Sequence, residues 1–378
     1  MKSFSLRLVI VVEKTNSVKA RQSGIELLRI LLMLQVIFLH ICVYGGYSTV
    51  AKQDFSNIHK ALFYSIYLSS RCPVYVYILI FGYFSVVSNK SLISIKGKIA
   101  KTYLPMIFYS LCIPLVGQLI GLWRINDVVK VRMFFPFTSR IWYFMTLYLL
   151  VLVLSPFLNK ALTALSKKEY TQLVVILFFM FSVWTVFSQL EQTSHVIRLD
   201  KIYELLNGKS LYGFIYMYIL GGYLRLHVPC HNKAKFRYLI IFAVLTVINI
   251  LLSKYVYSYS NISTANNNPF VVLQGLCLVM FFRDLKFRSK AINYITSVNL
   301  GVYMIHEQFL VRNKIWNDWF GFLHKKSFYS TWVYLLKIIL ICITVYMVCG
   351  LIEKVRTWLF AGIKALFWKI SSHRKANA

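Results

Sequence analysis

The chain has 378 residues, of which 58% are hydrophobic and only 15% are charged, and its 43 lysines and arginines against 12 acidic residues give a formal net charge of +31. This balance is typical of a polytopic membrane protein and excludes an ordinary soluble domain. The basic residues lie mostly in short loops between apolar stretches, a pattern that fits membrane topology and anionic lipid and argues against nucleic acid as a partner.

Ten apolar stretches are predicted to span a membrane, since a spanning helix needs about 20 mainly apolar residues. In chain order they are 25–44, 61–87, 103–123, 141–159, 172–188, 210–226, 238–257, 269–282, 291–311 and 331–352. The second is long, so we expect it to tilt or to be broken, and the fifth, sixth and eighth are short. The predicted fold is an all-α polytopic integral membrane protein with about ten transmembrane helices and no soluble domain.

The tails and loops suggest an orientation. Basic residues are concentrated in both tails and in alternate loops, which favours both termini in the cytosol. We therefore expect a cytosolic tail at 1–24, a transmembrane domain at 25–352 and a basic amphipathic tail at 353–378 that lies on the inner surface. The seven cysteines are scattered without a CxxC motif, so neither a disulfide framework nor a metal site is predicted.

Charged residues within the first predicted span are the first functional candidates, because each costs about 2.5–3.5 kcal/mol to insert. Glu26 precedes Arg29 by three residues and can pair with it, and His40 follows Arg29 by eleven residues, or about three helical turns. Arg29 and His40 should therefore share one face, about 16 Å apart along the axis. The alternative is an arginine that snorkels to the inner interface and a buried, hydrogen-bonded histidine.

The ninth predicted span carries a second polar group in NLGVYMIHEQFL. His306 is as far from the start of its span as His40 is from the start of the first, so the two rings should lie at similar depth. Tyr303 and Glu307 are four residues apart and share a helical face. A buried histidine with ordinary hydrogen bonds remains the alternative here too.

Arg71 lies near the middle of the second predicted span, in SSRCPVYV. Pro73 follows and loosens the local helix. An arginine this deep cannot easily reach the interface, so we expect it to have a partner or a ligand.

Together these stretches resemble the membrane-bound acyltransferase-3 family, the O-acyltransferases of bacterial surface glycans. That family carries an arginine, ten residues and a histidine in its first span, usually with an acid three residues before the arginine. Some members have two arginines in the second span, where this chain has Arg71 alone. The matching segments are Glu26, Arg29 and His40, FGYF at 81–84, KIAKTYLP ending at Pro105, the span with Trp142, Tyr143 and Pro156, and GVYMIHE at 301–307.

The resemblance implies acyl transfer in a bacterial plasma membrane, from acyl-CoA as donor substrate, acetyl-CoA by default, to a glycan or lipid-linked glycan, with no bound cofactor and no metal. His40 would act as general base or transient acyl carrier. Arg29, oriented by Glu26, would hold the donor phosphates, and Arg71 would stabilise negative charge or position the acceptor.

The remaining candidates are expected to bind substrate or to tune His40. They are Tyr303, His306, Glu307 and Trp142. Three other functions remain possible at this stage: a flippase of lipid-linked sugars, a glycan polymerase, and a structural membrane partner. A flippase would also line its path with intramembrane charges. A polymerase would be expected to have a larger extracytoplasmic loop, and a structural partner leaves the buried charges unexplained.

Overall fold

The computed structural model describes residues 21–44, 58–88, 90–189, 208–230, 235–255, 264–321 and 332–376, and this part of the chain consists of helices and short connections without a strand. Seven of its helical segments are long and apolar enough to cross a membrane. They are Ser23–Tyr44 (α1), Leu62–Ser85 (α3 and α4), Ile93–Leu119 (η1 and α5), Tyr143–Ala164 (α7), Lys167–Val186 (from α8 into α9), Phe236–Tyr255 (α12) and Trp332–Ile363 (within α17). The prediction of an all-α polytopic membrane protein is thereby confirmed.

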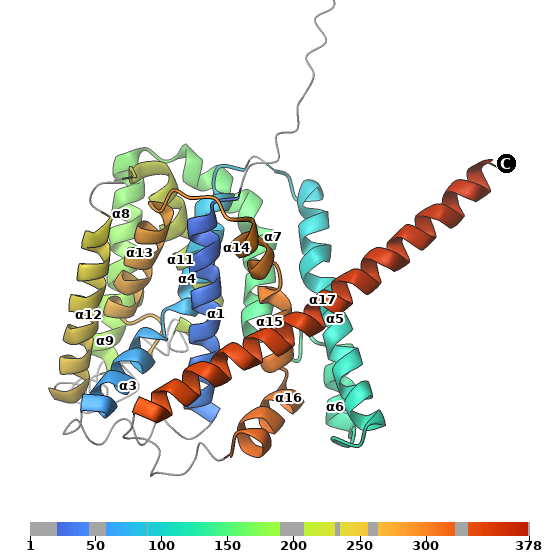
Figure 1. Ribbon diagram of the computed structural model, residues 1–378. Coiled ribbons are helices and arrows are strands. Elements are labelled where there is room, and N and C mark those ends of the chain that lie inside the picture. The colour runs from blue at the N-terminus through green and yellow to red at the C-terminus, as the bar shows by residue number, and fades with distance from the viewer. Residues whose placement is uncertain are drawn as a thin grey trace, which may run out of the picture.

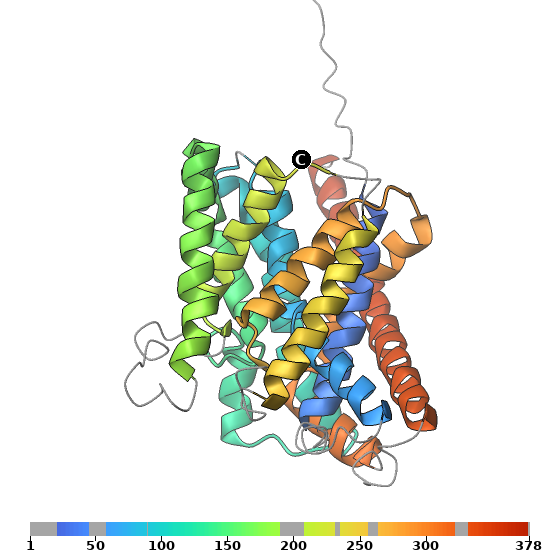
Figure 2. The ribbon, with the colours of Figure 1, turned by 90° about the vertical axis from the view of Figure 1, so that its left-hand side faces the viewer.

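The bundle is arranged around α1. This helix packs against α4 (Pro73–Ser85), α13 (Pro269–Arg283), α14, α15 and α17. In Figure 1, α8 (Lys167–Phe178) and α12 lie on one flank of the bundle. α5 (Lys96–Leu119) and α6 (Asp127–Phe134) lie on the other flank, and Figure 2 shows the α12 side turned to the viewer. A helix in this position carries its polar residues into protein and not into lipid.

Two predicted spans are shorter than the rest. The sixth is α11 (Leu211–His227), with 17 residues, and the eighth is α13, with 15. α11 fits closely against α4, because Gly82 and Gly221 let the two backbones approach: a Cβ on Gly82 would stand 2.2 Å from the carbonyl oxygen of Tyr218. Small residues at such contacts are typical of helix pairs in membranes.

The second span is broken, as its length and Pro73 led us to expect. α3 (Ile58–Ser69) ends, a turn follows, and α4 begins at Pro73, which occupies the first helical position. Proline is tolerated there because it has no N–H to lose. The break places Arg71 in the turn between two half-helices.

The prediction of one continuous helix over 291–311, the ninth span, is wrong. The chain instead forms α14 (Lys290–Thr296), α15 (Asn299–His306) and α16 (Phe309–Asn313), followed by a π-helix, η6. Gln308 separates the last two helices, since its backbone is extended and its side chain caps α16 by accepting from the N–H of Leu310. Apolar periodicity does not reveal such polar interruptions.

The last helix is longer than predicted. α17 runs unbroken from Trp332 to Ala376, so the expected boundary between membrane domain and tail, at 352/353, lies inside it (Figure 1). Glu353 is a third buried acid in a candidate span, beside the two that the sequence indicated. Its carboxylate pairs with Arg356 at 2.6 Å and accepts from the hydroxyl of Tyr109 on α5 (Lys96–Leu119). Where α17 leaves the membrane stays a prediction.

Candidate functional site

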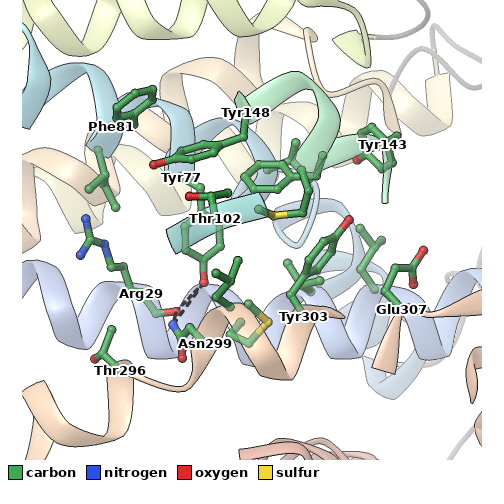
Figure 3. Close-up of a pocket in the computed structure, with 18 of the residues that line it drawn as sticks. Arg29, Tyr77, Phe81, Thr102, Tyr143, Tyr148, Thr296, Asn299, Tyr303 and Glu307 are labelled. Atoms are coloured by element: carbon green, nitrogen blue, oxygen red, sulfur yellow. Dashed lines mark hydrogen bonds between the residues drawn. The ribbon is translucent and has the colours of Figure 1, made fainter. Parts of the chain in front are cut away.

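A cavity of about 520 Å³ follows α1 from its first turn to its last. Glu26 and Arg29 line one end, and His40 and Tyr44 line the other (Figure 3 shows part of this lining). At 1.5 Å per residue, Glu26 and Tyr44 are about 27 Å apart along the axis, close to the thickness of a bilayer core. One cavity therefore connects the two ends of the predicted polar stripe.

The Arg29 end of the cavity is held by a network around α1. Arg29 Nη1 lies 2.9 Å from Glu26 Oε1, which is the predicted pair. The carbonyl oxygen of Arg29 accepts from the hydroxyl of Tyr77 at 2.7 Å and from Nδ2 of Asn299 at 2.8 Å (Figure 3). Asn299 Oδ1 accepts in turn from Tyr346 at 2.6 Å. The backbone that carries Arg29 is thus tied to α4, α15 and α17.

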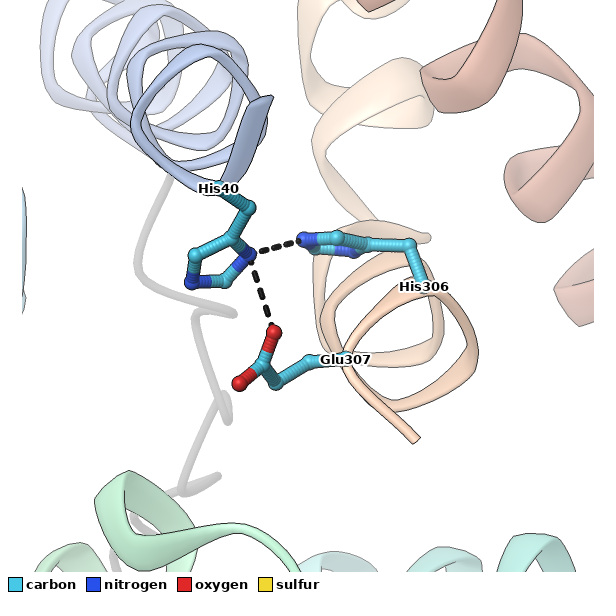
Figure 4. Close-up of side chains that lie close together, drawn as sticks. All are labelled: His40, His306 and Glu307. Atoms are coloured by element: carbon cyan, nitrogen blue, oxygen red, sulfur yellow. Dashed lines mark hydrogen bonds and ion pairs between the residues drawn. The ribbon is translucent and has the colours of Figure 1, made fainter. Parts of the chain in front are cut away.

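At the other end His40 meets the His306–Glu307 pair. His40 Nδ1 is 3.0 Å from His306 Nε2 and 3.1 Å from Glu307 Oε2 (Figure 4). The two imidazoles lie at the same depth, as their equal spacing in the two predicted spans indicates. Residues 266 positions apart in the sequence are therefore in direct contact.

The hydrogen bonds assign the proton positions on these rings. His306 Nδ1 is 2.6 Å from the carbonyl oxygen of Val302, which can only accept, so Nδ1 carries the proton. With both rings neutral, His306 Nε2 accepts and His40 Nδ1 donates. His40 Nε2 then keeps a free lone pair, and it points away from both neighbours in Figure 4. A histidine in this state is prepared to take a proton at Nε2.

Glu307 is fixed through its other oxygen. Oε1 accepts from Tyr44 at 3.0 Å and from Arg312 Nη1 at 2.9 Å, and the Arg312 guanidinium lies 4.3 Å from the centroid of the Tyr44 ring. Oε2 lies 3.1 Å from His40 Nδ1 without a well-aligned hydrogen bond, and the two form an ion pair only when His40 is protonated. Sequence reasoning missed Tyr44 and Arg312, although Arg312 follows Glu307 by only five residues.

Two further predicted residues face the cavity with unused donors. The hydroxyl of Tyr303 is buried without a hydrogen-bond partner among the described residues. Arg71 donates through Nη2 to the hydroxyl of Tyr67 and lies 4.6 Å from the centroid of that ring, while its buried Nε has no partner in the same set. Buried donors without partners at a cavity wall are available to a ligand.

Trp142 and His306 do not line the cavity. Trp142 is fully buried, and its Nε1 donates to the carbonyl oxygen of Met304 at 3.0 Å. It thereby holds α15 in place, which differs from the substrate contact that we expected of it. His306 is also fully buried and acts through His40.

The cluster also contains donors suited to a metal. His40, His306 and Glu307 offer three ligand atoms within 4.8 Å of one another. The hydrogen bonds described above account for the same distances, and His40 Nδ1 cannot both donate to His306 and bind a cation. The absence of a metal stays a prediction, with a test given below.

The fold and the cavity together describe a helical membrane protein with a cavity that follows α1. An arginine lines one end of this cavity, and a histidine held by its neighbours lines the other. The acyltransferase-3 family model, described as an acyltransferase domain, matches residues 22–354. The chain belongs to this family and is an acyltransferase. No curated protein and no solved structure matched it in the comparisons made.

Proposed function

We propose that the protein is an integral membrane O-acyltransferase of the bacterial plasma membrane. It moves an acyl group, acetyl as the default, from cytosolic acyl-CoA to a hydroxyl of a cell-surface polysaccharide or of its lipid-linked precursor. The proposal rests on one observation: a continuous cavity is lined by Arg29 at one end and by His40 at the other. This arrangement lets a donor and an acceptor meet from opposite sides of the membrane.

The donor enters at the Arg29 end. Arg29, held by Glu26 and partly exposed to the cavity, pairs with phosphates of the CoA moiety. The basic loops favour the cytosol on this side, and acyl-CoA is a cytosolic metabolite. Arg29 and His40 are about 16 Å apart along α1, so the extended pantetheine arm carries the thioester along the cavity toward the histidine.

Transfer then takes place at His40. Nε2 accepts the proton of the acceptor hydroxyl while the oxygen attacks the thioester carbon, and the positive charge formed on the ring is stabilised by Glu307 at 3.1 Å. The tetrahedral intermediate collapses, the C–S bond breaks, and the CoA sulfur leaves with the proton from His40. In this route the hydroxyl of Tyr303 donates to the oxyanion, which is supported by its unpaired donor at the cavity wall. A transient acyl group on His40 is the variant of this route that the same contacts allow.

The test compares surface glycan from a deletion strain complemented with the wild type, Arg29→Ala or His40→Ala at matched expression. We expect glycan O-acetyl content to fall to the level of the deletion strain in both variants. Acetylation that persists in both would overturn the proposal. Accumulated lipid-linked units would support the flippase alternative, and shortened chains would support the polymerase. Reporter fusions at both termini test the cytosolic orientation.

A further inference from the structure

Two cations, Arg71 and Lys209, line the same cavity as His40, Tyr143 and Glu307. Arg71 comes from the break between α3 and α4, and Lys209 from the loop just before α11. Lys209 was not among the residues predicted from the sequence, because a lysine in a loop carries no signal of its own.

Neither cation has an acidic partner in the part of the chain that the structure describes. Arg71 contacts the hydroxyl and ring of Tyr67, and its buried Nε is unpaired there. Lys209 Nζ lies 5.7 Å from the centroid of the Tyr143 ring. Burial, and after it the charge of Arg71, lower the pKa of Lys209, whereas the charge of Glu307 raises it.

The nearby carboxylate does not neutralise them. Among the described residues, the only acids lining the cavity are Glu26, which pairs with Arg29 at the far end, and Glu307, which is held by Arg312, Tyr44 and His40. Arg71 and Lys209 thus bring two positive charges to the wall of one cavity without an ion pair of their own among the described residues. An anionic group that enters the cavity is attracted by both charges.

We propose that Arg71 and Lys209 bind a negatively charged group of the acceptor, a carboxylate or a phosphate, so that the acceptor is an acidic glycan unit. This inference rests on the proposed function, because that function defines the acceptor. Arg71 could stabilise the oxyanion or bind the acceptor, and only a residue that binds the acceptor would select among acceptors of different charge. A uronate carboxylate and the phosphate of a lipid-linked sugar share this chemistry, and the experiment separates them.

The experiment measures binding of glycan to the purified full chain in lipid nanodiscs. The glycan is extracted from a deletion strain and used in three forms: untreated, with its carboxylates reduced to alcohols, and with its phosphates removed by hydrofluoric acid. Each form is tested on the wild type, Arg71→Gln, Lys209→Gln and the control Arg124→Gln, which replaces an arginine outside the cavity. Acetyl-CoA binding to each variant verifies that it is folded.

We expect one chemical treatment to weaken binding to the wild type by about tenfold or more. Arg71→Gln and Lys209→Gln should weaken binding of the untreated glycan to a similar degree and leave the treated glycan unaffected, and Arg124→Gln should change neither. Equal binding of all three glycans, or variants that weaken every form equally, would overturn the inference. The assay measures binding and does not require acyl transfer. Binding that depends on the charge of the glycan, in a protein that does not acetylate it, would therefore contradict the proposed function and leave this inference intact.

Discussion

His40 on α1 and Glu307, just after α15, approach each other to 3.1 Å between Nδ1 and Oε2, although the residues come from opposite ends of the chain. The contact fixes the side of the imidazole that faces the protein and leaves Nε2 to the cavity. A carboxylate beside a histidine base also occurs in unrelated acyl-transfer enzymes, where it orients the imidazole.

Replacing His40 by Ala should lower kcat for acetyl transfer by about 10²–10⁴-fold, because that is the usual contribution of a positioned general base. The apparent KM for acetyl-CoA should change little, since the donor phosphates are held at the other end of the cavity. Steady-state kinetics on the purified protein in nanodiscs checks both. A variant that loses donor affinity at unchanged kcat would contradict the base assignment.

Replacing Glu307 by Gln keeps the size of the side chain and removes its charge. We expect a fall in kcat of about 10²-fold or more, because the imidazolium loses the charge that stabilises it, although the hydrogen bond to His306 still sets the tautomer of His40. The matched control is Glu353→Gln, which removes a buried carboxylate far from His40 that pairs with Arg356. It should lower thermal stability and leave kcat of the folded fraction intact. Equal losses of kcat in both variants would argue for a purely structural Glu307.

The sequence predicted the polar stripe of α1 because a helix of known rise carries its own geometry. Three turns separate Arg29 from His40 whatever surrounds them, and both line one cavity. The equal spacing within two predicted spans indicated that His40 and His306 lie at similar depth, and it did not predict their contact. The two rings meet even though the break between α14 and α15 lies within the interval from which the depth of His306 was counted.

What the sequence could not predict are contacts made by turns and loops. Arg312, in α16, bonds Glu307 across the break at Gln308, and Lys209 lines the cavity from the short segment before α11. The expected substrate contact of Trp142 is a related case. The sequence does not distinguish a tryptophan whose indole faces a ligand from one whose indole donates to a backbone carbonyl, as Trp142 does to Met304. Tertiary packing decides these cases, and hydrophobic periodicity does not report it.

Arg29→Ala should raise the apparent KM for acetyl-CoA and have a smaller effect on kcat, because the guanidinium holds donor phosphates remote from the reacting carbonyl. The measurement is a donor titration with acetyl-CoA and with acetyl-pantetheine, which lacks the nucleotide. The wild type should prefer acetyl-CoA strongly, and the variant should lose most of that preference. If the preference were unchanged, the donor phosphates would have to bind elsewhere.

Incubation with a chelator followed by its removal should leave acetyl transfer unchanged, because the proposed route uses His40, His306 and Glu307 without a metal. Added Zn²⁺ should inhibit, since binding at Nδ1 of His40 and at Glu307 competes with the hydrogen bonds that prepare the base. Metal analysis of the purified protein accompanies the kinetics. Activity that is lost on chelation and restored by one divalent cation would replace the general-base assignment with a metal site.

The close contact between α4 and α11 makes a prediction about stability. A Cβ on Gly82 would lie 2.2 Å from the carbonyl oxygen of Tyr218, and backbone cannot move aside as a flexible side chain can. Gly82→Ala should therefore destabilise the protein by about 1–3 kcal/mol, seen as a lower Tm in detergent. Gly97→Ala is the matched control, because a methyl group at that position would meet no described atom within 4 Å and alanine favours the helix. α4 also carries Tyr77, which bonds the carbonyl oxygen of Arg29, so the Gly82 variant should weaken acetyl-CoA binding as well. A Tm equal to that of the wild type would show that the two helices are not in the contact described.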